Sequence, residues 1–297
     1  MKLQIINVES IYRRLLNSAN AQEREAIYRQ ELLAPFESMM RIYGGGDDPL
    51  AWAKMWTLYT PEDFDGEQRP LIEDMVRRLA NDGSGQKFAT ALERGVAAFA
   101  PYVDRIELDT ITCAVVLTKH HGNMPGRGYA GFGGIPGSLM VSLSLVDDYT
   151  LPRVGPAAVH ELNHNVRFKI LPFLPMSVTV ADYIIAEGLA ESFAAELFGD
   201  DLVGYFVTDF NEEELVTARR VISGALGVSG FNAVRSYIFG DTISASAGLP
   251  KAGVPDFAGY AIGYRVVQQY LQRTGRSVVE ATFLPSQEII AESGFFE

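Results

Sequence analysis

Two of the four histidines in this 297-residue chain lie four residues apart, in the pentapeptide HELNH at residues 160–164. Side chains with this spacing share a direction if the backbone is helical, because four residues complete one turn plus about 40° and rise about 6 Å. Pro156 precedes the pair at a position that suits a first helical turn, and Pro172 and Pro175 follow it. The sequence therefore predicts a helix of about four turns with both imidazoles on one face.

Two imidazoles on one helical face can both bind a single zinc ion. Glu161 follows the first histidine, where its carboxylate can reach a water on the metal without being a ligand, which is the position of a general base. His160 and His164 are therefore candidate metal ligands, and Glu161 is a candidate catalytic residue. The alternative is a helix that carries two histidines on one face for ordinary packing.

A catalytic zinc site usually has three protein ligands and leaves one position to water. No histidine follows His164, and Arg167 and Ile170 stand where the metzincin pattern places its glycine and its third histidine. The third ligand is therefore expected to be a carboxylate. The downstream segment offers Glu187, with Asp182 as the second choice.

Glu187 lies in a segment with recognisable helix boundaries. Residues 179–182 resemble a capping box, and Gly199 ends the helical pattern. Glu191 follows Glu187 by one turn among apolar residues, where a carboxylate is costly to bury unless it is paired or bound to metal. We expect Glu187 to be the third ligand and Glu191 to hold a ligating histidine. The alternative places Glu191 and Glu196 on the wet face and buries Glu187 alone.

The spacing of apolar residues divides the chain into regions. Residues 1–100 have the i, i+4 spacing of helices, with a break at the turn-forming residues 44–49. The spacing becomes that of β-strands over residues 106–117, and again over 139–143 after a glycine-rich stretch. From Pro156 onward the pattern is helical with interruptions. We expect an α+β protein that is mostly helical, with a small mixed sheet and a helical C-terminal lobe.

The histidine-containing motif at residues 160–164 and the acidic motif at residues 187–191 together resemble motifs of known enzymes. HELNH followed by EGLAE at residues 187–191 is similar to the gluzincin arrangement of thermolysin-type peptidases. More closely, the chain resembles the YjaZ-like family of predicted zinc-dependent proteases over about residues 100–295. Further marks are the glycine-rich segment 128–137 and the segment GYAIGY at 259–264, whose small residues would let a helix approach another element closely.

This resemblance implies a zincin-like metallopeptidase fold with Zn²⁺ as its cofactor. We expect a helical N-terminal region over residues 1–100 and a catalytic domain over 101–297. In that domain, residues 101–170 would carry the sheet and the metal helix, and residues 171–297 would form the helical lobe. The first hundred residues contain no motif that indicates a role.

In gluzincins an edge strand above the metal pairs with the extended substrate by strand addition. The resemblance assigns this role to residues 135–143, where preceding glycines would permit close backbone approach. Gly134, Ile135 and Gly137 are therefore candidate substrate-binding residues. The alternative is a hairpin turn that leads into a core strand.

Amide hydrolysis also needs a hydrogen-bond donor for the developing oxyanion. Thermolysin-type enzymes use a downstream histidine in addition to a tyrosine, and this chain has no such histidine. Tyr260 and Tyr264 are four apart on a predicted helix and are the candidate donors. A pair of core tyrosines is the alternative. His120 and His121, which we expect to be exposed loop residues, are the next candidates.

The composition narrows the choice of partners and location. With 25 Lys and Arg against 37 Asp and Glu, the net charge is −12, which argues against nucleic acid or an anionic membrane surface as the main partner. No apolar run approaches the roughly 18 to 20 residues of a membrane span, and charge follows the first residues too soon for a secretory signal. Cys113 is the only cysteine, which excludes a disulfide framework and a Cys-based zinc site. A reducing, cytoplasmic location is expected.

Together these features predict a zinc-dependent peptidase that acts on a peptide or protein substrate, with Glu161 as the general base. The absence of a recognisable aminopeptidase motif favours an endopeptidase or oligopeptidase. One alternative is a catalytically silent zinc-binding regulatory or peptide-binding protein on the same fold, although the intact Glu161 argues against it. Another is a hydrolase of non-peptidic substrates. Nothing in the sequence indicates the oligomeric state.

Overall fold

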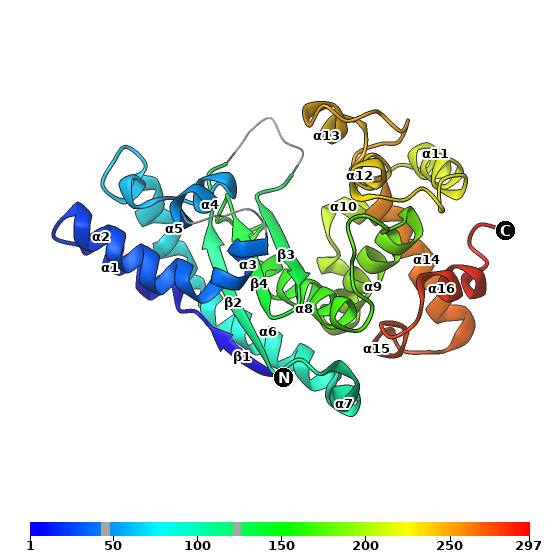
Figure 1. The fold of residues 1–297 in the computed structure, drawn as a ribbon, viewed down its shortest axis with the longest axis horizontal. Helices are drawn as coiled ribbons and strands as arrows, with labels where there is room; N and C mark the ends of the chain where they lie inside the picture. The colour runs from blue at the N-terminus through cyan, green and yellow to red at the C-terminus, as the bar shows by residue number, and fades with distance from the viewer. Residues whose placement is uncertain (43–47, 121–125) are drawn as a thin grey trace. The chain divides into compact units, whose positions relative to one another are not determined.

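The computed structural model describes residues 1–42, 48–120 and 126–297. The described chain is mostly helical with one small mixed sheet (Figure 1), so the expected α+β class is confirmed. It forms two compact units. Unit 1 consists of Met1–Ala97, 108–120 and Gly126–Glu161, and unit 2 consists of Ala98–Glu107 and Leu162–Glu297.

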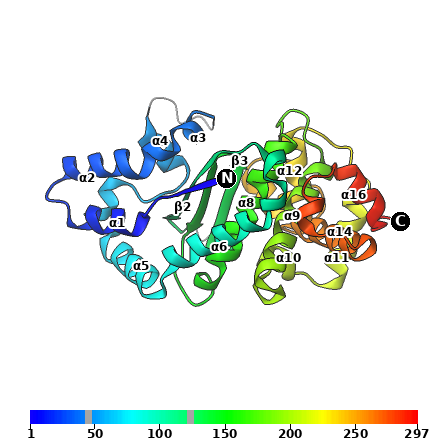
Figure 2. The same ribbon diagram turned by 90° about the horizontal axis from the view of Figure 1, so that it is seen from below.

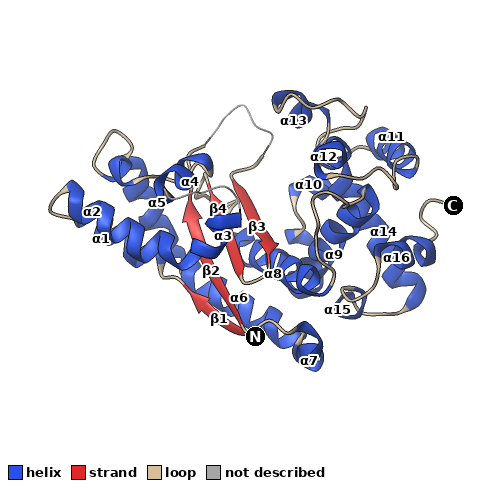
Figure 3. Ribbon diagram, in the orientation of Figure 1, coloured by secondary structure: helices blue, strands red, loops and turns tan. Residues whose placement is uncertain are grey.

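All the strands that the structure describes belong to unit 1 (Figure 3). The sheet has the order β1-β2-β4-β3, formed by β1 (Lys2–Ile5), β2 (Thr110–Leu117), β3 (Tyr129–Ile135) and β4 (Ser138–Leu143). β1 and β4 run parallel to β2, and β3 runs antiparallel to β4. β2 and β4 are buried along most of their length, as is typical of strands covered on both faces.

The edge strand differs from the one expected. The segment 135–143 spans the end of β3, a turn and the buried strand β4. Gly137 has a φ of +96°, a conformation that favours glycine, so the hairpin alternative is correct and β3 lies at the edge. The preceding strand also begins later than expected. Ile106 ends the short helix α7 (Val103–Ile106), and β2 begins at Thr110.

The N-terminal region is not helical throughout, because β1 pairs in parallel with β2 from Lys2↔Thr110 to Ile5↔Cys113. The expected division at residue 100 therefore does not coincide with the two units. The helices of this region are α1 (Val8–Asn17), α2 (Ala21–Ile27), α3 (Glu37–Ile42), α4 (Pro49–Met55), α5 (Arg69–Asp82) and α6 (Ser84–Ala98), with shorter helical turns at Tyr28–Leu33, Ala34–Phe36 and Pro61–Phe64. Of the break expected over 44–49, residues 44–47 lie outside the described residues.

The buried face of α1 fixes this helix to the sheet. Its apolar residues recur every three or four positions, as in an amphipathic helix. Tyr12 is buried among them, and its hydroxyl accepts a hydrogen bond from the backbone N–H of Leu117 on β2 at 3.0 Å. The ring of Tyr12 also lies 5.3 Å from that of Phe64. The helices of the N-terminal region thus share one core with the sheet.

Helices α9 (Val180–Phe198) and α14 (Ala258–Thr274) run side by side at the centre of unit 2 (Figure 2). A Cβ on Gly263 would lie 2.7 Å from the carbonyl carbon of Ile184, so only glycine permits this crossing. A Cβ on Gly259 would lie 2.6 Å from the Cα of Ile238 on α12. The close approach expected of the small residues in 259–264 is confirmed.

Further helices surround this pair in unit 2. They are α10 (Tyr205–Thr208), α11 (Glu212–Ser223), α12 (Phe231–Phe239), α13 (Asp241–Ser246), α15 (Val278–Ala281) and α16 (Ser286–Ser293). Helix α8 (Val154–Ile170) is continuous and contributes its first half to unit 1 and its second half to unit 2. Within the described ranges, no helix is both long enough and apolar enough to span a membrane.

Candidate metal centre

Helix α8 carries the HELNH pentapeptide, as the sequence predicts, and it ends at Ile170 before the two prolines. On it, His160 and His164 are one turn apart and buried. Glu187, from the middle of α9, is buried beside them. One ligand atom from each of these three residues lies within 4.8 Å of the other two. Among the residues that the structure describes, this is the single cluster of its kind.

The three residues fit a zinc ion in both chemistry and spacing. Two imidazole nitrogens and a carboxylate oxygen form a donor set that zinc favours. The Nε2 atom of His164 lies 3.3 Å from Oε2 of Glu187. Two ligand atoms that are each about 2.0–2.1 Å from a tetrahedral zinc lie about 3.3 Å apart. Glu187 therefore lies close enough to His164 to complete such a donor set, and its role as the third ligand stays a prediction.

Helix α9 has the predicted boundaries, and these account for Asp182. The carboxylate of Asp182 accepts hydrogen bonds from the backbone N–H of Thr179 at 3.1 Å and from its hydroxyl at 2.6 Å. This capping box starts the helix, and Gly199 ends it. Asp182 therefore caps α9 and is absent from the ligand cluster, whereas Glu187 lies in it.

Glu191 is buried and accepts a hydrogen bond from the backbone N–H of Gly204 at 2.5 Å. It therefore anchors the segment that follows α9. Its expected contact with a ligating histidine stays a prediction. Glu196 is exposed, so the wet-face alternative holds for Glu196 and is wrong for Glu191.

The candidate general base lies directly against the edge strand. A Cβ on Gly131 would lie 2.6 Å from Cδ of Glu161, and a Cβ on Gly133 would lie 2.8 Å from its carbonyl carbon. Because alternate residues of a strand face the same side, these two glycines leave room for α8 and for the carboxylate. The sequence predicted close backbone approach of a substrate at Gly133 and Gly134, whereas the structure places α8 against Gly133 and Gly131, and the contact at Gly131 was not predicted. Two glycines separated by one residue on the same strand, as at 131 and 133, could have indicated that one face of the strand is closely approached.

The opposite face of β3 contacts the N-terminal region. The ring of Phe132 packs edge-on against Trp56 at 4.9 Å, and Trp56 stacks on Trp52 of α4 at 5.1 Å. The edge strand is thus packed on both faces, against α8 on one and against the end of α4 on the other. This gives the N-terminal region a structural role beside Glu161.

The expected substrate-binding residues lie at the end of this strand. Ile135 pairs with Ser138 and Phe132 pairs with Met140, with a shift of register between Phe132 and Ile135. Gly134 lies within this irregularity, next to the close contact at Gly133. Gly137 lies in the hairpin turn instead of the strand. Residues 134 and 135 are therefore on the edge strand, and residue 137 is not.

The candidate oxyanion donors lie on α14. The ring of Tyr260 is surrounded by three aromatic rings, those of Phe206 at 5.1 Å, Phe257 at 5.9 Å and Phe239 at 6.0 Å. Both tyrosines are partly buried against the apolar cluster of Ala195, Val203 and Val207. Burial raises the pKa of Tyr264 to about 12, and the nearby carboxylates of Asp200 and Glu191 act in the same direction.

The alternative donors are two adjacent histidines. His120 is exposed, as expected, and its Nδ1 lies 3.2 Å from the hydroxyl of Ser144. His121 lies outside the described residues.

A buried arginine ties the metal helix to the segment 282–286, a role that the sequence does not predict. Arg167 donates hydrogen bonds to the carbonyl oxygens of Thr282 and Leu284, both at 3.1 Å, and to the hydroxyl of Ser286 at 3.0 Å. Asn163, one turn earlier, donates to the hydroxyl of Thr282 at 2.9 Å. Burial lowers the pKa of Arg167 to about 10, with a smaller opposing effect from Asp182.

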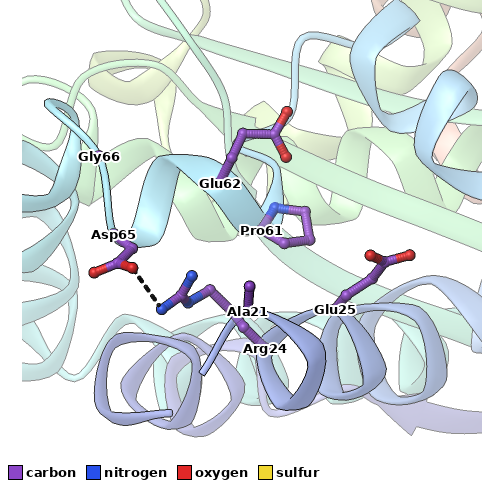
Figure 4. Close-up of a pocket in the computed structure, with 7 residues that line it drawn as sticks. All are labelled: Ala21, Arg24, Glu25, Pro61, Glu62, Asp65 and Gly66. Atoms are coloured by element: carbon purple, nitrogen blue, oxygen red, sulfur yellow. Dashed lines mark ion pairs between the residues drawn. The ribbon is translucent and has the colours of Figure 1, made fainter. Parts of the chain in front are cut away.

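A separate pocket of about 300 Å³ lies in unit 1 between α2 and the turn Pro61–Phe64 (Figure 4). The buried Arg24 forms an ion pair with Asp65 across it at 3.1 Å and donates to the hydroxyl of Ser18. Glu25 and Glu62 also line the pocket. None of the candidate ligands or catalytic residues lines it.

Comparison with known proteins places this centre in a family. The family described as "Predicted Zn-dependent protease (DUF2268)" matches residues 92–291. The chain belongs to this family. The match includes the whole candidate centre and begins near the boundary expected at residue 100.

Two relatives from Bacillus subtilis (strain 168) are similar to this chain. The uncharacterized protein YjfC is 35% identical over 290 residues, which cover 95% of each chain. The uncharacterized protein YjaZ is 27% identical over 150 residues, 50% of this chain and 54% of YjaZ. No solved structure matches. Because the likeness to YjfC covers nearly the whole chain, it extends into the N-terminal residues that lie outside the match to the predicted Zn-dependent proteases.

Proposed function

We propose that this protein is a zinc-dependent peptidase of the gluzincin type, with a zincin-like fold, that hydrolyses peptide bonds. The observation that carries the proposal is the buried cluster of His160, His164 and Glu187, with Glu161 next to the first ligand. Membership of a family of predicted zinc-dependent proteases supports the same reaction.

His160, His164 and Glu187 would hold the zinc ion. When bound, zinc supplies a Lewis acid that polarises the substrate carbonyl and lowers the pKa of a water molecule. Glu161 accepts the proton of that water and delivers it to the leaving amine. The packing of its backbone and side chain against Gly131 and Gly133 supports this role, because a general base must be held at a defined position.

The edge strand β3 is the proposed site of substrate pairing. It has a strand neighbour on one side in the described sheet, and an extended peptide can add to such an edge by backbone hydrogen bonds. Gly134 and Ile135 are the proposed contacts on β3, and Gly137 shapes the turn that ends it. A substrate strand bound there would lie beside Glu161, which supports a peptide or protein as the substrate.

Tyr264 or Tyr260 is the proposed oxyanion donor. A phenol must be protonated to donate a hydrogen bond, and burial keeps the pKa of Tyr264 near 12, far above neutral pH. For the location we propose a reducing compartment such as the cytoplasm, since the single cysteine, Cys113, is buried on β2.

The decisive experiment compares the wild type with Glu161→Gln for metal content and for cleavage of a mixed peptide library. We expect about one zinc per chain in both proteins and cleavage by the wild type alone, because a neutral amide cannot accept the proton of water. Zinc in both proteins without cleavage in either would contradict the proposal and indicate a silent zinc-binding protein. Equal cleavage by both would remove Glu161 from the mechanism.

A further inference from the structure

The loop that follows the metal helix carries two strongly exposed apolar side chains. Leu174 is 59% exposed and Met176 is 90% exposed, in the stretch that joins α8 to α9. Exposed apolar side chains that form one continuous patch, in contrast to scattered ones, indicate a binding surface. The apolar side chains next to Leu174 and Met176 along the loop, above all Phe173, therefore bear on whether this loop has a function.

Aromatic rings connect this loop to the metal centre. Phe168, one turn after His164, stacks on its imidazole with a centroid separation of 5.2 Å and an interplanar angle of 5°. Phe168 contacts Phe173 in the loop at 5.0 Å, and Phe173 packs edge-on against Tyr183 at 5.4 Å. Tyr183 lies on α9 one turn before Glu187. The loop is therefore joined by rings to positions next to two of the three candidate ligands.

The series of rings continues beyond Tyr183, which packs edge-on against Phe239 of α12 at 5.9 Å. Each ring in the series is half-buried, with part of its surface exposed. We call the following side chains the apolar row: Phe168, Phe173, Leu174, Met176, Tyr183 and Phe239. All six belong to unit 2.

We propose that the apolar row binds large apolar side chains of the polypeptide substrate close to the bond that is cut. This inference rests on the proposed peptidase function and adds the class of substrate. A polypeptide that reaches the metal passes next to Phe168 and Tyr183, because these lie one turn from the ligands. The partly exposed rings and the two exposed loop side chains lose water-accessible apolar area when such a segment binds.

The chemistry of the row also specifies how selective this binding is. The rings, Leu174 and Met176 offer mainly apolar surface, to which the hydroxyl of Tyr183 and the guanidinium of Arg235, 5.8 Å from the Phe239 ring, add two polar groups. Met176 has a flexible, polarizable thioether that adapts to differently shaped partners. The preferred substrate is therefore a segment with several aromatic or aliphatic side chains, such as a stretch of unfolded polypeptide. A segment of polar side chains should bind less tightly.

The test uses zinc-loaded Glu161→Gln protein, so that binding is measured without turnover. Two labelled peptides of equal length are compared, one with Phe and Leu at alternate positions and one with Ser in their place. We expect the apolar peptide to bind more tightly. We also expect Leu174→Ser combined with Met176→Ser to weaken that binding about tenfold and to leave the serine peptide unaffected.

A matched control removes equally exposed apolar side chains elsewhere. Ile42 is 65% exposed and Val216 is 62% exposed, and neither lies in the row. Serine at both of these positions should leave the affinity for the apolar peptide unchanged. Equal binding of the two peptides, or an equal loss of affinity in the control, would overturn the inference. Dissociation of a dimer by the Leu174 and Met176 changes would also overturn it, by assigning the surface to a second copy of this chain.

A second measurement separates this inference from the proposed function. In the wild-type background, the Leu174 and Met176 changes should raise KM for an apolar peptide about tenfold and leave kcat unchanged, because they remove contacts that are made equally in the ground state and the transition state. If the wild type cleaves no peptide but the binding results hold, the peptidase proposal fails and the apolar row remains a polypeptide-binding surface. If it cleaves apolar and serine peptides with equal kcat/KM, the inference is wrong.

Discussion

A Cβ atom on Gly131 would lie 2.6 Å from the carboxylate carbon of Glu161. Real Cβ atoms do not come so close to such a neighbour, because the separation is well inside van der Waals contact. The Glu161 side chain therefore occupies space that any other residue at position 131 would fill. A residue on the edge strand thereby determines where the proposed general base can stand.

Gly131→Ala should lower kcat by about a hundredfold. The methyl group displaces the Glu161 carboxylate from β3, and a base that is moved by about 1 Å loses much of its contribution. Zinc content and the midpoint of thermal unfolding should change little, because the displaced atoms end a flexible side chain. Steady-state kinetics with metal analysis measures all three quantities.

Gly85→Ala is the matched control for this change. A Cβ on Gly85 would meet nothing within 4 Å, and alanine favours the helix in which it lies. This variant should keep full activity. Full activity of Gly131→Ala as well would show that the contact with Glu161 does not position the base.

His164→Ala and Glu187→Gln should each lose zinc. Removal of one of three protein ligands leaves too few to hold the ion against competition from a chelator. The wild type should contain about one zinc per chain and should release it on prolonged treatment with a strong chelator. Asp182→Asn serves as the control, since Asp182 caps α9. Full zinc occupancy in His164→Ala would contradict the assigned ligand set.

Arg167→Met should lower the free energy of unfolding by about 2 kcal/mol. Burial lowers the pKa of the guanidinium to about 10, below the value of a free arginine, so its removal recovers about 3 kcal/mol. The change also leaves the two buried acceptors on Thr282 and Ser286 and the part-buried carbonyl of Leu284 without a donor. Each lost partner costs about 1–3 kcal/mol, and their sum exceeds the recovered free energy, so the protein is destabilised. Urea unfolding measures the difference. As a control, Arg220→Met at an exposed position should leave the free energy of unfolding unchanged. If Arg167→Met is more stable than the wild type, the cost of burying the charge exceeds the contribution of its hydrogen bonds.

Tyr264→Phe should lower kcat about a hundredfold, with KM and zinc content unchanged, if this phenol stabilises the oxyanion. Because its pKa is raised to about 12, the phenol keeps its proton as the pH rises past 10, where an exposed tyrosine loses it. Between pH 8 and pH 10 the rates of the wild type and of Tyr264→Phe should therefore change with pH in the same way, because the phenol does not lose its proton in this range. If kcat is unchanged in this variant, the same measurements on Tyr260→Phe decide whether either tyrosine is the donor.

The centre could be predicted from the sequence where it depends on local structure. The i, i+4 spacing fixes the relation of His160 to His164 on any helix, and the capping box at Thr179 sets the start of α9. Glu187 was found because a carboxylate among apolar neighbours requires a partner. Each of these signals lies within a few residues of the feature that it predicts.

The edge strand and the arginine could not be predicted in this way. Which strand lies at the edge depends on pairing between β2 and β4, which the local alternation of residues does not reveal. The acceptors of Arg167 lie 115 to 119 residues further along the chain. Nothing near Arg167 in the sequence indicates these acceptors. From the sequence alone, Arg167 is indistinguishable from an exposed charged residue near the end of a helix.

The distance along the chain between Arg167 and its acceptors also orders events during synthesis. At about 5–20 residues per second, the ribosome adds Thr282 roughly 6–23 s after Arg167. Until then, the guanidinium that is buried in the finished protein has no carbonyl oxygens to bind and stays in water. The metal helix therefore reaches its final packing only after the segment 282–286 has been made. A nascent chain that already contains His160, His164 and Glu187 still lacks the contacts that hold this helix, which delays the assembly of the candidate metal centre until residues 282–286 have been made.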